Sequence, residues 1–205
     1  MSEQRDKNLW IFNAGNSFAG NPKWMFEYII RHHKEIKPVW MCYNADTMNY
    51  VHKLGYEAEL YHSSKGKSVM AKAGVYVVEM CKEVFQPELT GITVLNLWHG
   101  VGCKSIERKV TDGFLQERIA KKYIQNNDIL RNNQLFLVTS EIMEKHFKEQ
   151  CGIDDDKVIR AGYPRCVVND NIQSYDHDIR KKKGLSANTK LAIYCPTYRD
   201  NNGAN

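Results

Sequence analysis

The sequence has no long hydrophobic run. Its longest apolar stretches, such as residues 92–98 and 135–138, fall far short of the roughly 20 residues that a transmembrane helix needs. Residues 1–8 are polar, with no positive segment leading into an apolar one, so we expect no secretory signal peptide. Hydrophobic residues make up 42% and charged residues 26% of the chain. That composition is typical of a chain that folds around a core, and it excludes a disordered or collagen-like protein.

Paired cysteines and the common nucleotide-binding glycine motifs are also missing. The six cysteines include no C-x-x-C pair, which fits neither a disulfide framework nor a structural zinc site and favours a reducing cytosol. The absence of G-x-G-x-x-G disfavours NAD binding and nucleotide-sugar enzymes of other Rossmann families. Cys103 stands before Lys104 where a Walker A motif has glycine, so we do not read a P-loop there.

Positive charge is what the sequence has in excess. The formal net charge is +5, and cations gather in residues 104–122 and 180–183. This distribution suits an anionic partner such as phosphate, a lipid headgroup or nucleic acid, although a solvated surface is the simpler explanation of any one run. The length of 205 residues corresponds to one domain or to one and a half.

Strand and helix patterns alternate as far as residue 161. We expect strands at 9–13, 37–43, 56–61, 75–80, 92–98, 135–140 and 157–161, and helices at 22–34, 45–54, 64–73, 114–124 and 141–150. At the first helix, Asn21 is expected to be the N-cap and Pro22 the first helical residue. Trp24, Tyr28 and Ile29 are expected to pack on the sheet. Because several strands are apolar on both faces, the pattern predicts a Rossmann-like α/β domain with helices on both faces of a parallel sheet. A further strand is expected at 190–195.

Ligands of such sheets bind beyond the carboxyl ends of the strands. The strongest candidate there is His99, followed by Gly100 and Gly102, which let a ligand approach the backbone, and by Lys104. An imidazole at this place can take the proton of a hydroxyl beside a phosphate. A metal pair or nucleophile dyad of His99 and Cys103 lacks a third group, while a structural turn with a hydrogen-bonded histidine stays open as the plainer alternative.

Three other strand ends carry small polar residues or arginines. The first strand-to-helix loop holds the residues Asn16, Ser17, Gly20, Asn21 and Lys23. Small and hydroxyl residues before a helix N-terminus predict an anion or polyol site, with ordinary capping as the alternative. Arg165 follows the strand at 157–161, and Thr197 and Arg199 follow the strand at 190–195, where a guanidinium can take two phosphate oxygens. The remaining histidines are expected at the surface: His32, His33, His52, His62, His146 and His177.

Four segments, in this order, resemble the CDP-glycerol glycerophosphotransferase family, which comprises teichoic acid polymerases and primases and related capsule polymerases. The segments are 16–23 (NSFAGNPK), 97–100 (LWHG), 162–165 (GYPR) and 194–200 (YCPTYRD). The resemblance implies a GT-B fold of two Rossmann-like domains facing a cleft. Residues 1–168 would be the N-terminal, acceptor-side domain, 169–189 a linker with a polar helix, and 190–205 the start of a truncated donor-binding domain.

The same resemblance implies an activity in building the bacterial cell envelope. Glycerol phosphate or another polyol phosphate would pass from CDP-glycerol or CDP-ribitol to a hydroxyl of a growing cell-surface polymer, with release of CMP. His99 would be the general base, and Lys104 would hold negative charge near the diphosphate. Such in-line attack needs mostly positioning and charge neutralisation. In the family, a second histidine and the residues that bind the donor diphosphate lie in the C-terminal half of the protein. We therefore expect this chain alone to be inactive.

The implied partners are the CDP-linked donor, a polymer or lipid-linked acceptor and an anionic membrane surface, with no nucleic acid. The protein would be cytoplasmic and peripheral at the inner face of the plasma membrane. The segment 101–103 departs from the threonine, proline and leucine of many members, a variation associated with the capsule-type branch. No cofactor and no metal ligand set is predicted, and the need for a divalent metal stays open. The alternative function is a non-catalytic module that docks acceptor or membrane.

Overall fold

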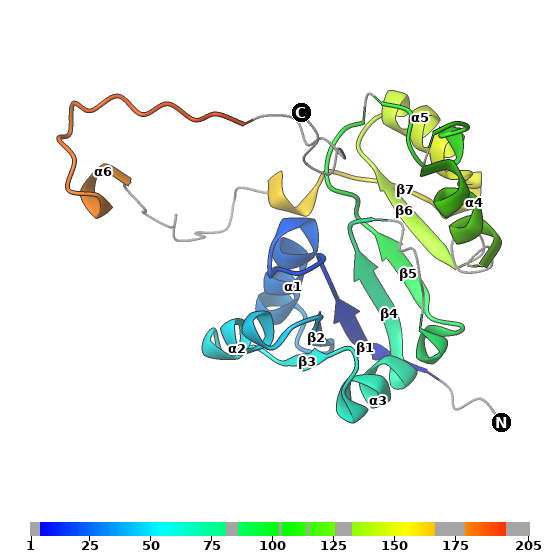
Figure 1. The fold of residues 1–205 in the computed structure, drawn as a ribbon. Coiled ribbons are helices and arrows are strands. Elements are labelled where there is room, and N and C mark those ends of the chain that lie inside the picture. Colours follow the sequence, from blue (N-terminus) through cyan, green and yellow to red (C-terminus); the bar gives the residue numbers. More distant parts are fainter. Residues whose placement is uncertain are drawn as a thin grey trace. The chain divides into compact units, whose positions relative to one another are not determined.

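The computed structural model of the protein describes residues 5–80, 86–102, 104–113, 115–125, 133–166 and 179–195. Within them, parallel strands form one seven-stranded sheet in the order β3-β2-β1-β4-β5-β6-β7 (Figure 1). The strands are β1 (Asp6–Phe12), β2 (Lys37–Cys42), β3 (Ala58–Leu60), β4 (Ala73–Val78), β5 (Thr93–Asn96), β6 (Gln134–Val138) and β7 (Val158–Arg160). The predicted Rossmann-like α/β class is confirmed.

Helices and short 3-10 turns connect the strands. The helices are α1 (Gly20–His32), α2 (Ala45–Lys53), α3 (Ser64–Lys72), α4 (Leu115–Gln125), α5 (Glu141–Cys151) and α6 (Ile179–Lys182). The turns are η1 (Pro87–Leu89), η2 (Glu107–Lys109), η4 (Asp155–Lys157) and η5 (Pro164–Cys166). At the starts of α2, α3 and α5, the side chains of Asn44, Ser63 and Ser140 accept hydrogen bonds from backbone N–H groups. Gly152, in the left-handed conformation, ends α5.

Each face of the sheet has its own apolar core. On one face, Phe26 of α1 and Phe147 of α5 belong to the same cluster as Phe12 of β1. On the other face, Met70 of α3 belongs to a cluster with Ile11 of β1. Because successive residues of a strand point to opposite faces, the adjacent pair Ile11 and Phe12 buries β1 on both sides.

The start of α1 differs from the sequence prediction. The N-cap is Ala19, with no capping side chain, and Pro22 is the third helical residue. Asn21 therefore lies inside the first turn, and its side chain is engaged elsewhere, as described below. Tyr28 is exposed and Trp24 is only half-buried, so of the three residues expected to pack on the sheet only Ile29 is fully buried.

The chain divides into two compact units, residues 1–167 and 168–205. In the second unit the described residues form α6 and an extended segment. The strand expected at 190–195 is wrong, because these residues belong to no ladder and are exposed, Ile193 to 82% and Tyr194 to 89%. A strand needs a neighbour to accept its hydrogen bonds, and none of the described strands pairs with this segment. None of the described helices is long and apolar enough to span a membrane.

The strand order reverses its direction at one place on the sheet. The chain adds β2 and β3 on one side of β1, and then returns to place β4 on its other side. Loops that leave β1 and β4 at their carboxyl ends therefore diverge to opposite faces, and this switch point is where doubly wound sheets bind ligands. The predicted histidine loop follows β5, the next strand along.

Candidate active site

The loop that carries His99 begins with a strained residue. Trp98 has a φ of 52°, a conformation that is uncommon for any residue other than glycine. Its backbone N–H donates to Oδ1 of Asn96 at 3.0 Å, and the amide of Asn96 donates to Gln134 at 3.0 Å. The Trp98 ring packs edge-on to Phe147, with ring centroids 5.2 Å apart. Buried hydrogen bonds and ring packing thus hold the turn at the end of β5 in place.

His99 is exposed, and its orientation is fixed by a backbone hydrogen bond. Its Nδ1 lies 2.7 Å from the backbone carbonyl oxygen of Glu79, at the end of β4. Because a carbonyl only accepts, Nδ1 is the protonated nitrogen. Nε2 of the neutral ring then keeps its lone pair, which is the protonation state that a general base needs. The ring also stacks on Trp98, with centroids 4.4 Å apart and planes 25° apart.

Asn21 connects the start of α1 with two loops of the site. Its side-chain amide donates to the backbone carbonyl of Trp98 at 2.7 Å. Its Oδ1 accepts a hydrogen bond from the backbone N–H of Arg165 at 3.4 Å. Three segments that are far apart in the sequence therefore meet at one buried side chain.

Tyr163 brings the loop after β7 against the His99 loop. Its hydroxyl donates to the backbone carbonyl of Gly100 at 2.8 Å. Burial raises the pKa of Tyr163, which keeps this donor protonated at neutral pH. The guanidinium of Arg165 lies over the Tyr163 ring, with its Cζ 5.4 Å from the ring centroid. A Cβ at Gly100 would lie 3.6 Å from the Arg165 guanidinium, so an exposed cation lies beside the His99 loop.

The other residues predicted in the first loop make contacts with neighbouring residues of the protein. Lys23 lies 3.9 Å from the carboxylate of Glu27 and 5.4 Å from the ring centroid of Phe18. Ser17 donates to the carbonyl of Ala14 at 3.4 Å and is exposed. Asn16 is exposed, and its backbone carbonyl accepts from the Thr47 hydroxyl at 2.8 Å.

The remaining predicted residues are two glycines, a lysine and two residues of the second unit. Gly20 faces the carboxylate of Glu79, and Gly102 faces the ring of His146. Lys104 is exposed in the same loop as His99. Thr197 and Arg199 lie outside the described residues.

Sequence reasoning missed several residues that build the site. Asn96, Glu79 and Tyr163 were not predicted, although each lies at or just after the end of a strand, where the same search rule applies. His146 was expected at the surface but is half-buried, with its Nε2 against Gly102. No spacing in the sequence indicates that contact, because it joins α5 to a loop more than 40 residues earlier.

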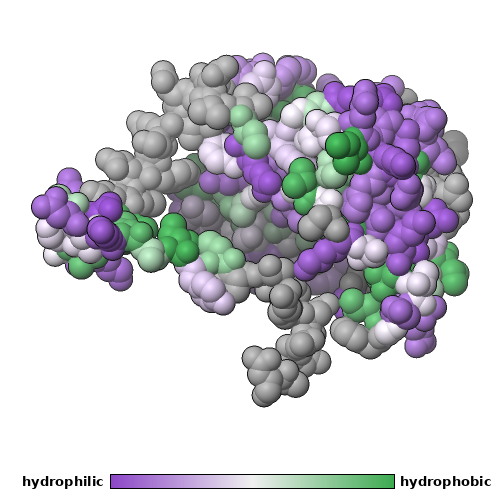
Figure 2. Space-filling view, turned by 90° about the horizontal axis from the view of Figure 1, so that it is seen from above, coloured by the Kyte–Doolittle hydropathy of each residue, from purple (hydrophilic) through white to green (hydrophobic). Residues whose placement is uncertain are grey.

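The surface of the molecule is hydrophilic on the side of α4 and α5. Figure 2, seen from above, shows hydrophilic side chains gathered on the side of α4 and α5. Among the described residues, no group of three or more His, Cys, Asp or Glu side chains could hold a metal ion.

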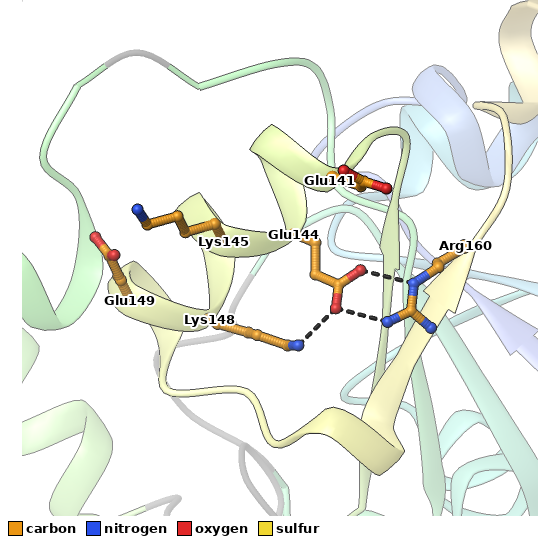
Figure 3. A pocket seen from close by; sticks show the side chains of 6 residues that line it. All are labelled: Glu141, Glu144, Lys145, Lys148, Glu149 and Arg160. Atoms are coloured by element: carbon orange, nitrogen blue, oxygen red, sulfur yellow. Dashed lines mark hydrogen bonds and ion pairs between the residues drawn. The ribbon is translucent and has the colours of Figure 1, made fainter.

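A shallow pocket on α5 lies apart from the predicted residues. It is lined by Glu141, Glu144, Lys145, Lys148, Glu149 and Arg160 (Figure 3). Glu144 accepts two hydrogen bonds from the Arg160 guanidinium, at 2.6 and 2.7 Å, and one from Lys148 at 2.5 Å. The hydrogen bonds from Lys148 and Arg160 lower the pKa of Glu144. This ion network joins α5 to the edge strand β7, and we assign it to stability.

Comparisons with known proteins agree with these motifs. The family model of CDP-glycerol:poly(glycerophosphate) glycerophosphotransferase matches residues 1–204. The chain is 24% identical over 200 residues to the teichoic acid poly(glycerol phosphate) polymerase of Bacillus subtilis (strain 168), covering 91% of this chain and 25% of that protein. The polymerase of the same name from Bacillus spizizenii is 21% identical over 213 residues, covering 96% and 51%. The chain thus spans about a quarter to a half of the length of these relatives.

A similar fold occurs in a solved structure. The wall teichoic acid polymerase TagF matches with a TM-score of 0.72 and 20% sequence identity, over 96% of this chain and 49% of that one. At this identity the likeness shows the fold. The family match, which extends over nearly the whole sequence, shows that the chain belongs to the CDP-glycerol:poly(glycerophosphate) glycerophosphotransferase family.

Proposed function

We propose that the first unit is the acceptor-side domain of a transferase that moves glycerol phosphate from CDP-glycerol to a hydroxyl of a growing cell-surface polymer. The observation that carries the proposal is the state of His99. Its Nδ1–H is held by the Glu79 carbonyl at 2.7 Å, its ring is exposed, and the guanidinium of Arg165 lies beside its loop. A base and a cation beyond the carboxyl ends of the strands are the groups that phosphoryl transfer to a hydroxyl needs.

In this proposal His99 starts the reaction at Nε2. The acceptor hydroxyl gives its proton to Nε2 while its oxygen attacks the phosphorus that carries glycerol. A new P–O bond forms, the bond from that phosphorus to the bridging oxygen breaks, and CMP leaves with the bridging oxygen. Arg165 and Lys104, both exposed, would neutralise the charge of the diphosphate.

We further propose that donor binding needs a second domain, to which residues 190–205 belong. The relatives that match are two to four times as long as the matched segment. Thr197 and Arg199 would contact the donor from that domain, and the chain by itself would then be inactive. CDP-ribitol is the alternative donor.

The partners and the cellular place remain part of the proposal. A polymer of teichoic acid or capsule type, free or lipid-linked, would be the acceptor. The positive net charge supports contact with an anionic membrane surface from the cytoplasmic side. A divalent metal at the diphosphate would have to be supplied with the donor or by residues outside the described part of the chain.

The test is release of CMP from CDP-glycerol by the longest natural protein that contains this chain, with a glycerol phosphate oligomer as acceptor. We expect His99→Ala to lower the rate about a hundredfold or more while leaving the thermal unfolding temperature unchanged. His62→Ala is the matched control. Like His99, His62 is an exposed histidine that follows a strand, but its strand is β3, at the outer edge of the sheet and away from β5. A rate equal to that of the control would contradict the role of His99, whereas no release of CMP by the unsubstituted protein would favour the docking module.

A further inference from the structure

We infer that Asn21 is a positioning residue that holds the His99 loop in its working conformation, and that it does not contact the substrate. The inference rests on the proposed function of His99 as the base. It assigns a new role to a residue that the sequence places among the substrate-binding residues of the first loop.

The burial and bonding of Asn21 carry the first step. Its side chain is 0% exposed. Its amide nitrogen donates to the Trp98 carbonyl, and its amide oxygen accepts from the Arg165 backbone. With its nitrogen and its oxygen both engaged inside the protein, Asn21 is occupied in holding its neighbours together.

The chemistry of the amide carries the second step. One partner is a carbonyl, which needs a donor, and the other is an N–H, which needs an acceptor. Asparagine supplies both from one short side chain. Aspartate has the same shape but donates nothing when ionised, so it would put a carboxylate oxygen against the Trp98 carbonyl inside the protein.

The position of the bonds along the loop carries the third step. Asn21 holds the carbonyl of Trp98, which precedes His99, and Tyr163 holds the carbonyl of Gly100, which follows it. The Glu79 carbonyl holds the imidazole itself. His99 is thus fixed on both sides of its backbone and at its ring, and loss of one backbone tie should release the ring from its single tautomer.

The experiment measures the His99 tautomer and the exchange of the loop amides in the 205-residue chain. Nitrogen-15 NMR distinguishes an imidazole protonated at Nδ1 from one protonated at Nε2, and hydrogen exchange is followed in peptides that cover residues 97–102. We expect Asn21→Asp to move His99 from the Nδ1–H form toward the Nε2–H form. We also expect amide exchange in this loop to become about tenfold faster.

Asn13→Asp is the matched control. Asn13 is also 0% exposed at the same sheet edge, and its amide donates to the carbonyls of Gly15 and Met41 at 2.9 Å. The same substitution there buries the same carboxylate but leaves the ties to Trp98 and Gly100 intact. We expect it to lower thermal stability without changing the His99 tautomer.

A second variant covers the case in which Asn21→Asp fails to fold. Asn21→Leu keeps the branched skeleton of the side chain but removes both hydrogen-bonding atoms and adds no buried charge, and it should shift the tautomer in the same direction. Tyr163→Phe, which removes the hydroxyl that bonds to Gly100 and also contacts Thr139, should act in the same way and less than additively with Asn21→Leu. The inference is wrong if these variants leave the tautomer and loop exchange as in the Asn13→Asp control. That outcome would not affect the proposed function, which fails separately if His99→Ala releases CMP at the rate of the His62→Ala control.

Discussion

The carboxylate of Glu79 lies in the space that a side chain on Gly20 would need. A Cβ built on Gly20 would come within 1.9 Å of Oε2 of Glu79, and Gly20 has a φ of 68°. Glycine is therefore favoured at the start of α1 by its positive φ, and a Cβ there would also displace the end of the Glu79 side chain. Since the backbone carbonyl of Glu79 holds His99, this contact also connects the first loop to the candidate base.

Gly20→Ala should lower the stability of the protein by more than Gly15→Ala does. Gly15 has a similar φ of 63°, but no atom lies within 4 Å of its built Cβ, so its substitution costs about 1–2 kcal/mol of backbone strain alone. We expect Gly20→Ala to cost at least about 1 kcal/mol more, because Glu79 must also move. Urea unfolding of both variants measures the difference. Adding Glu79→Ala to Gly20→Ala should remove it, and equal losses for the two glycine variants would contradict the steric argument.

Substitutions of Gly102 and His146 should have coupled effects on the stability of the protein. A Cβ on Gly102 would lie 2.8 Å from Nε2 of His146, which is buried. We expect Gly102→Ala to destabilise the protein by about 1 kcal/mol or more, and to cost clearly less when His146 is already alanine. A double-mutant cycle by thermal or urea unfolding gives the coupling. Additive losses would show that α5 and the loop move apart without strain.

Glu144 should make the stability of the protein fall as the pH becomes acidic. Hydrogen bonds from Lys148 and Arg160 hold the pKa of Glu144 below its ordinary value. A carboxylate with a lowered folded-state pKa stabilises the protein above its unfolded-state pKa, about 4.3 for glutamate. That contribution disappears as the pH falls through the folded-state pKa. The unfolding temperature of the unsubstituted chain should therefore fall more steeply below about pH 4.3 than that of Glu144→Gln. The control is Glu149→Gln, since Figure 3 shows Glu149 on the side of α5 away from Arg160.

The four cysteines that the structure describes should divide into fast and slow classes toward maleimide. Cys166 and Cys195 are exposed, whereas Cys42 and Cys151 are buried. Burial, with a smaller effect of Glu59, raises the pKa of Cys42 to about 11, so its thiolate is scarce at pH 7. Peptide mass spectrometry after brief labelling should find Cys166 and Cys195 modified. Cys42 and Cys151 should react only after denaturant is added, and their labelling in the native protein would contradict the packing described here.

Much of the sheet could be predicted because its signals are local. The alternation of apolar strands with capped helices gave every strand of the first unit within a few residues, and Ser63, Ser140 and Gly152 act at the helix ends. The strand expected at 190–195 failed for the opposite reason. Its apolar pattern is local, but a strand exists only where another strand accepts its hydrogen bonds.

The site could be predicted only in part. Strand ends and the family motifs predict His99 and Arg165, and the structure brings the Arg165 guanidinium beside the His99 loop. The roles of Asn21 and Tyr163 could not be found in the same way, because each depends on a backbone group of a distant segment. The sequence predicts Asn21 as a helix N-cap, the usual role of asparagine before proline. In the structure its side chain instead bonds to the backbones of Trp98 and Arg165.

The order in which the chain is made has a consequence for the three-segment junction at Asn21. Asn21 is separated from Trp98 by 77 residues and from Arg165 by 144. A chain leaving the ribosome therefore presents α1 first, then the histidine, and the tyrosine and arginine of the last loop only afterwards. The ribosome makes His99 after Asn21 and Glu79 but well before Tyr163, so a nascent chain stalled before residue 163 would carry the base on a loop that still lacks its hydrogen bond at Gly100.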